Sequence, residues 1–121
     1  MVATNATLKT NCYFFPLGSD FDFTPRTLEE MTSGLKRPFY NARYEAACAL
    51  EKLGAAAAPA VPALMRSLGD SNGIVRNASI WALGSIGPAA SNALPVLRTF
   101  LTHESRFTVK AAREAIERIG G

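Results

Sequence analysis

The sequence predicts an all-α fold, a short α-solenoid of about three helix pairs preceded by an extended arm. Apolar residues recur at a fixed shift of 33 from residue 25 onward, and each period holds two stretches with helical spacing. A glycine closes every period, at Gly54, Gly87 and Gly120. We therefore expect an arm or N-terminal cap at residues 1–24 and a repeat domain at 25–121. Its units are about 25–54, 58–87 and 91–120.

The first helix of each unit follows from apolar spacing and from proline. Leu28, Met31 and Leu35 have the i, i+3, i+7 spacing of one helix face. Thr24 is a suitable N-cap, and Pro25 suits the first helical position. The later copies have prolines near the same point, at Pro59, Pro62 and Pro95. Each unit is therefore expected to open on a helix N-terminus.

The second helix is predicted over roughly 42–53, 75–86 and 108–119. In the middle copy Val75, Ser79 and Ile86 fall on one face at about 100° per residue. Small residues repeat on that face, which lets neighbouring helices approach closely. The closing glycines are expected to adopt positive φ after the helix. One pair cannot bury its apolar face alone, so stacked pairs must share a core.

Composition argues against several functional classes. Hydrophobic residues make up 48% of the chain and charged residues 19%, as in a folded domain. The net charge of +3 comes without a dense basic cluster, which argues against nucleic acid as a partner. No run approaches the 18 or so apolar residues of a membrane span, so none is expected.

The two cysteines, Cys12 and Cys48, have no metal-type spacing. We expect free thiols in a reduced intracellular compartment, the cytoplasm. A plastid is the alternative, because the first eighteen residues contain no acidic residue, as in a transit peptide.

No catalytic constellation is visible. With His103 as the single histidine, no Ser-His-Asp arrangement is in view, and neither cysteine has an evident activating base. Glycines occur singly at helix ends rather than in a phosphate-binding loop. The expectation is a chain that is not an enzyme and that needs no cofactor and no metal.

The stretches ARYEAACALEKLG (42–54), AAPAVPALMRSLGD (57–70) and VRNASIWALGSIG (75–87) resemble HEAT repeats of the short, bacterial, lyase-like type. The resemblance covers about residues 25–121. It implies that Asp70 in the turn pairs with Arg76 of the second helix. Arg43 then lacks its acid, because Arg37 stands at the corresponding turn position.

Proteins of this type include binding scaffolds, phycobilin lyase subunits, phycobilisome-degradation factors and di-iron hydroxylases. The last group needs several His-Glu pairs, whereas this chain has only His103 beside Glu104. The resemblance therefore implies a non-enzymatic adaptor or accessory subunit that binds another protein or a multi-protein complex. The alternative is a phycobilin lyase-like or phycobilisome-associated factor.

Second helices line the concave face of such solenoids, and that face is the expected binding site. The candidate residues are Trp81, Tyr44, Asn77, Ile80, Cys48, Lys110, Arg113 and Glu114. Trp81 is the only tryptophan, and an outward position with basic neighbours favours a binding hot spot. The alternative is that Trp81 packs beneath the N-terminal segment or a neighbouring helix.

The N-terminal arm is rich in aromatic residues without helical spacing. These are Tyr13, Phe14, Phe15, Phe21 and Phe23. They are expected to cover the open end of the first unit as a cap. The alternative is a docking segment that becomes ordered on binding a partner.

Overall fold

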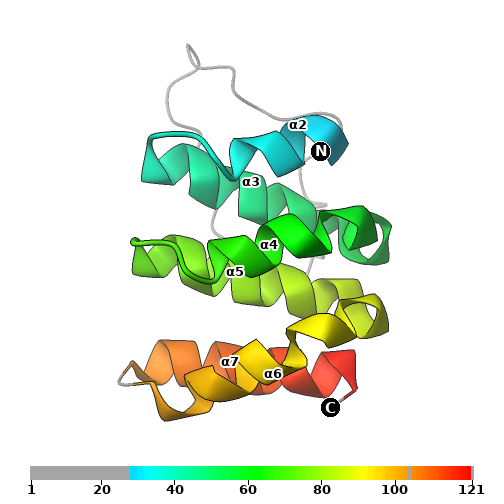
Figure 1. Ribbon diagram of the computed structural model, residues 1–121, viewed down its shortest axis with the longest axis vertical. Coiled ribbons are helices and arrows are strands. Elements are labelled where there is room, and N and C mark those ends of the chain that lie inside the picture. Colours follow the sequence, from blue (N-terminus) through cyan, green and yellow to red (C-terminus); the bar gives the residue numbers. More distant parts are fainter. Residues whose placement is uncertain (1–27, 104, 121) are drawn as a thin grey trace, which may run out of the picture.

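The computed structural model describes residues 28–103 and 105–120, and this part of the chain is helical with no strand. Three helix pairs are stacked one above the other (Figure 1). Their bounds are α2 Leu28–Gly34 and α3 Tyr40–Leu53, α4 Val61–Ser67 and α5 Gly73–Ile86, α6 Leu94–Thr99 and α7 Arg106–Ile119. The predicted all-α solenoid is confirmed. Thr24, Pro25 and the aromatic arm lie outside the described residues.

Short 3-10 helices connect the units, η1 at Gly54–Ala60 and η2 at Gly87–Ala93, and a third, η3 at Phe100–Thr102, extends α6. Pro62 and Pro95 are the second residues of α4 and α6, where a missing N–H removes no helical hydrogen bond. The closing glycines have positive φ, 62° at Gly54, 84° at Gly87 and 106° at Gly120. The predicted role of these glycines is confirmed.

The second helices begin two residues before the predicted starts, because the N-cap precedes the first buried residue of each helix. Asn72 is the N-cap of α5, and its side chain accepts hydrogen bonds from the N–H groups of Ile74 and Val75. Ser105 caps α7 in the same way. The apolar period therefore marks where burial begins rather than where the helix begins.

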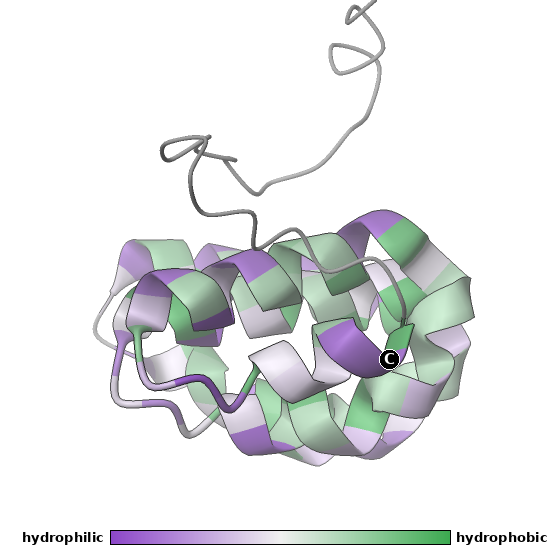
Figure 2. Cartoon of the chain, turned by 90° about the horizontal axis from the view of Figure 1, so that it is seen from above, coloured by the Kyte–Doolittle hydropathy of each residue, from purple (hydrophilic) through white to green (hydrophobic). Residues whose placement is uncertain are grey.

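The first and second helices form two layers, visible along the stack in Figure 2. The largest fully buried side chains come from both layers: Leu50, Leu64, Val75, Ser79, Ile80, Leu83 and Leu97. Helix α5 lies in the middle of the second layer and packs against both α3 and α7. This continuous core explains why no unit needs to be stable alone.

Glycine and alanine set the closest helix contacts. A Cβ added at Gly84 would lie 2.9 Å from the Cα of Ala115, so α5 and α7 meet almost backbone to backbone. A Cβ at Gly34 would lie 2.8 Å from the Cβ of Ala46, which places α2 equally close to α3. Small side chains are thus required here by contact rather than by helix propensity.

Two continuous helical stretches, Tyr40–Ser67 and Gly73–Thr102, are long and apolar enough to cross a membrane by length and composition alone. Each contains a 3-10 connector at which the chain turns back, so that each is a pair of helices rather than one rod (Figure 1). In the solenoid, 44% and 50% of their most apolar windows are buried. Half or less of each window therefore serves the core.

Candidate functional site

Three of the residues expected on the outward concave face are buried instead. Tyr44 is 9% exposed, Cys48 is 3% exposed and Ile80 is fully buried, and all three belong to the hydrophobic core. The expected outward orientation of these side chains is therefore wrong. For Ile80 the reason is lateral packing: α5 is flanked by both α3 and α7, so its buried face is wider than that of an isolated pair.

The remaining concave-face candidates divide into packed and exposed groups. Trp81 is half-buried and packs against the core, while Asn77 accepts a hydrogen bond of 2.9 Å from the Thr108 hydroxyl of α7. Lys110 and Arg113 are exposed, and Glu114 is half-buried. Among these candidates, the exposed charged side chains come from α7. The binding role of these residues stays a prediction.

Cys48 is disulfide-bonded, so the expectation of a free thiol at this position is wrong. The other cysteine, Cys12, lies outside the described residues. Sequence spacing could not reveal the bond, because a pairing between distant cysteines depends on the fold. Cys48 is thus a structural residue rather than a nucleophile or a surface contact.

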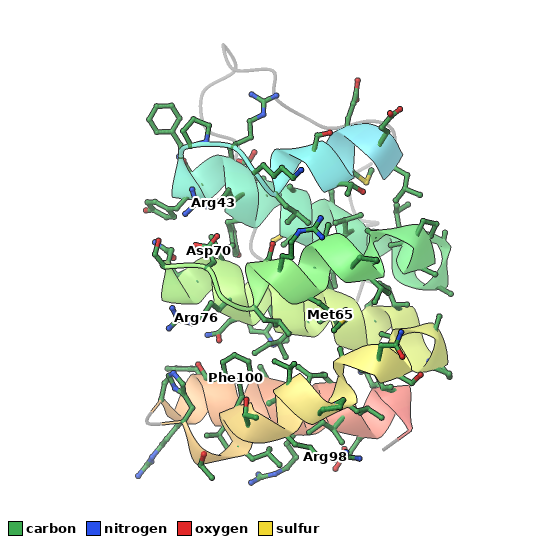
Figure 3. The ribbon with its side chains drawn as sticks, in the orientation of Figure 1. Arg43, Met65, Asp70, Arg76, Arg98 and Phe100 are labelled. Atoms are coloured by element: carbon green, nitrogen blue, oxygen red, sulfur yellow. The ribbon has the colours of Figure 1, made fainter. Side chains whose placement is uncertain are left out.

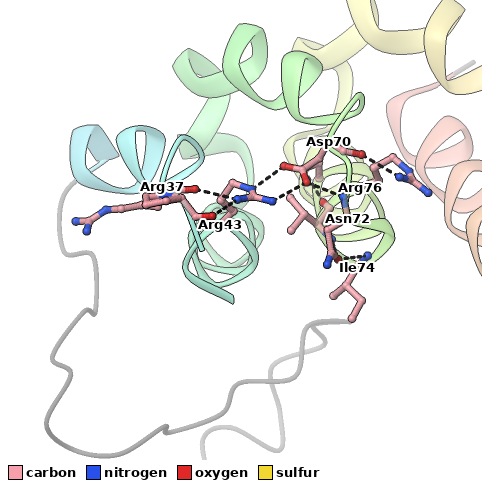
Figure 4. Close-up of polar contacts among 9 residues, drawn as sticks. Arg37, Arg43, Asp70, Asn72, Ile74 and Arg76 are labelled. Atoms are coloured by element: carbon pink, nitrogen blue, oxygen red, sulfur yellow. Dashed lines mark hydrogen bonds and ion pairs between the residues drawn. The ribbon is translucent and has the colours of Figure 1, made fainter. Parts of the chain in front are cut away.

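An ion pair joins the first two units at the turns. Arg43 of α3 donates from Nε to Oδ2 of Asp70 at 2.8 Å and from Nη2 to Oδ1 at 3.0 Å (Figure 4). The Nη1 of Arg43 donates to the carbonyls of Arg37 and Pro38 in its own turn. The expectation that Arg43 lacks an acid is therefore wrong, because the acid comes from the next unit.

Arg76 bonds the turn differently from the predicted pairing. Its Nη1 donates to the backbone carbonyl of Asp70 at 2.9 Å, while the carboxylate of Asp70 is engaged by Arg43. The predicted Asp70–Arg76 side-chain pair is replaced by a side-chain-to-backbone bond. Burial alone would raise the pKa of Asp70, but hydrogen bonds from Arg43 and the Asn72 N–H, with the charges of Arg43 and Arg76, hold it below its ordinary value.

The turns before α3, α5 and α7, together with the first residues of these helices, lie on one side of the molecule. We call residues 36–43, 69–76, 103 and 105–107 the turn edge. Arg43, Asp70 and Arg76 follow one another along it at the left of Figure 3. Four of the largest exposed apolar side chains lie on this edge: Phe39 at 71% exposure, Tyr40 at 49%, Ile74 at 52% and Phe107 at 76%.

Two of the exposed apolar residues follow the repeat. Ile74 and Phe107 each occupy the second residue of a long helix, one period apart. In the first unit, Phe39 takes the N-cap position that Asn72 and Ser105 occupy in the others, and it provides no side-chain cap. Replacing a polar N-cap typically costs about 1 kcal/mol, so Phe39 is a poor choice for folding. Because the Phe39 side chain is 71% exposed, burial in the core does not offset that loss.

Sequence reasoning missed the turn edge, although a signal was present. Ile74 and Phe107 align at one period, immediately before the apolar pattern of the predicted second helices. The second helices were predicted to begin one residue after these two positions. Both positions were therefore assigned to turns, where a single exposed apolar residue is common and does not indicate a binding site.

The described residues contain no cluster of three His, Cys, Asp or Glu side chains placed to hold a metal ion. Comparison with protein families matches residues 27–117 to HEAT repeats. A search of curated proteins gives no match. The family match spans most of the chain and coincides with the three stacked helix pairs, and the chain therefore belongs to the HEAT-repeat family.

Proposed function

We propose that the chain is a non-enzymatic protein-binding adaptor, or an accessory subunit of a larger assembly, which binds its partner through the turn edge. The observation that carries the proposal is the row of exposed apolar side chains formed by Phe39, Ile74 and Phe107. HEAT repeats commonly serve as protein-interaction scaffolds, which supports the general role. Rows of exposed apolar groups mark interaction sites, whereas isolated ones do not.

Folding does not account for this row. Other exposed large apolar residues, such as Leu53, Val96 and Leu101, are 37–38% exposed, so most of each side chain still contacts the protein. Phe39 and Phe107 are about twice as exposed. A side chain that contributes neither to the core nor to a cap is available to a partner.

The concave face and the N-terminal arm remain further predicted contacts. Trp81, Lys110 and Arg113 lie on the second helices, where a partner bound at the turn edge could extend. The phycobilin lyase-like or phycobilisome-associated role rests on the family resemblance alone.

The test replaces the apolar row by asparagine, the residue that the first unit has at the position of Ile74 and Phe107. Wild type and the triple variant Phe39→Asn, Ile74→Asn, Phe107→Asn are used to capture partners from the native source, with quantitative mass spectrometry. We expect a partner retained by wild type to fall at least about tenfold with the variant, since hot-spot side chains contribute on the order of 2 kcal/mol.

The matched control is Val96→Asn, Leu101→Asn, which removes exposed apolar groups outside the edge. Urea unfolding establishes that each variant is folded. Equal capture of every partner by wild type, control and triple variant would show that the edge is not the binding site.

A further inference from the structure

We infer that the outward side of α3 is the docking site of the chain's own N-terminal segment around Cys12, which a disulfide bond to Cys48 holds there. Access of a partner to this part of the concave face therefore depends on the redox state of the two cysteines. Two independent observations support the inference: the bonding of Cys48 and the burial of its side chain. Neither involves the turn edge, so the inference does not depend on the binding site proposed above.

The bonding of Cys48 leaves one partner within the chain. The sequence contains two cysteines, Cys12 and Cys48. Cys48 is disulfide-bonded, and no cysteine among the described residues is free. Within one chain the second sulfur is therefore that of Cys12, and the bond brings the two Cβ atoms to about 4 Å from each other. The three residues that follow Cys12 are aromatic, which suits a segment that covers an apolar helix face.

The burial of Cys48 is the reverse of what its place in the stack predicts. Trp81 and Glu114 stand at the same position one and two periods later, and both are half-buried, whereas Cys48 is 3% exposed. Ser85, one turn after Trp81, donates a hydrogen bond to the Glu51 carbonyl of α3, so this flank of α5 faces the preceding unit. Helix α3 belongs to the first described unit (Figure 1). Cys48 should thus be the most exposed of the three, and it is the most buried.

The described helices do not provide this cover. Helix α2 meets α3 at Ala46, whose Cβ lies 2.8 Å from a Cβ added at Gly34. At about 100° per residue, Cys48 points about 160° away from Ala46. Tyr44, one turn earlier on the outward side, is also buried at 9% exposure, although its counterpart Asn77 is half-buried. The cover therefore comes from outside the described residues, where the second cysteine also lies.

The disulfide makes the cover reversible. A dithiol reductant gives two electrons and two protons to the bond, which becomes two thiols, while the reductant closes to its own disulfide. Release of the segment uncovers Tyr44 on α3, and the half-buried Trp81 lies on the same outward side of α5. The oxidised chain thus offers a partner the α5 and α7 parts of the concave face, whereas the reduced chain also offers α3.

The bond is tested on the intact chain purified without reductant. Free thiols are blocked with iodoacetamide in urea, and trypsin then releases each cysteine in a separate peptide, 10–26 and 44–52. We expect mass spectrometry to find the two peptides joined in the monomeric protein and separated after dithiothreitol. Alkylation of both cysteines, or a disulfide-linked dimer on a non-reducing gel, would overturn the inference.

The cover is tested by limited digestion with chymotrypsin, which has aromatic sites at 13–15, 21 and 23. Oxidised wild type is compared with Cys12→Ser, after circular dichroism has shown that both are folded. We expect cleavage in this segment to be at least about tenfold slower in wild type, and dithiothreitol to remove the difference. Cleavage at the exposed Phe39 is the internal control and should not change.

Two results of the digestion contradict the inference. Equally fast cleavage in both proteins would show that the segment is bonded to α3 but does not cover it. Equally slow cleavage would show that the cover does not depend on the disulfide. Either result would leave the binding site proposed at the turn edge unaffected.

Discussion

The two joints between successive units differ, although they join the same kind of repeat. Between α3 and α5, a bidentate ion pair links Arg43 to Asp70. Between α5 and α7, a neutral hydrogen bond joins Thr108 to Asn77, and Gly84 lies directly against Ala115. The first joint adds an ion pair at the turns to its helix packing, whereas the second combines a neutral hydrogen bond with a closer backbone contact.

Position 103 explains part of the difference. In the middle unit, an Oδ1 of Asp70 accepts a hydrogen bond of 2.9 Å from the Asn72 N–H. In the last unit, Nδ1 of His103, one period later, accepts a bond of 3.0 Å from the Ser105 N–H. Histidine therefore reproduces the turn but brings no negative charge toward Arg76. The backbone of the repeat and the ion pair between repeats are separable features.

Gly84→Val should break the packed joint and produce the largest loss of stability. The new side chain would begin 2.9 Å from the Cα of Ala115, and a backbone atom cannot move aside as a flexible side chain can. We expect the free energy of unfolding, measured by urea and circular dichroism, to fall by about 3 kcal/mol. Arg113→Val is the control on the exposed side of α7 and should cost about 0.5 kcal/mol. Similar losses for both would mean that the close contact is not important.

Asp70→Asn should weaken the charged joint by about 2 kcal/mol at neutral pH, because Arg43 loses its anionic partner in a partly buried site. The pKa of Asp70 is lowered in the folded state, so its contribution is present above the unfolded value of about 3.9 and is lost as pH falls through the folded pKa.

Urea unfolding of wild type and Asp70→Asn from pH 7 to pH 2 checks this sign. The difference between the two proteins should shrink only below about pH 4. Other groups, such as Glu45, whose pKa is raised by burial, titrate in both proteins and largely cancel. A difference that stays constant down to pH 2 would contradict the pairing.

His103→Asp should create an ion pair between α5 and α7 like the one between α3 and α5. Its effect on stability should be the smallest of the three substitutions. Aspartate can keep the turn bond to the Ser105 N–H and add a carboxylate for Arg76. We expect a gain of about 0.5 kcal/mol, since partly exposed pairs contribute little. The gain in stability should vanish when Arg76 is also replaced by glutamine. A gain that persists in that background would show that the aspartate stabilises the turn itself and not an ion pair with Arg76.

Periodicity was sufficient to predict the fold. The buried positions Met31, Leu64 and Leu97 and the positive-φ glycines could all be derived from one alignment of the chain with itself. The ion pair could not be derived in this way, because the partner of Arg43 lies 27 residues away in the next unit. The expected pairing was assigned within each unit.

Burial on the concave face could not be predicted either. The face of a single helix assigns Ile80 to a flank, but neighbouring helices on both sides close over it. The exposed row was missed for the opposite reason. Phe39 stands where a capping residue is expected. The period of apolar residues predicts which side chains are buried, so it cannot identify an apolar side chain that is exposed.

The shared direction of α3, α5 and α7 has a consequence for how such a chain can change length. An in-frame duplication of one unit would add one more helix N-terminus to the turn edge and would keep every later helix in register with the shared core. An insertion of any other size would place the later units out of phase with that core. A chain built in this way therefore tolerates gain or loss of complete repeats better than other changes of length.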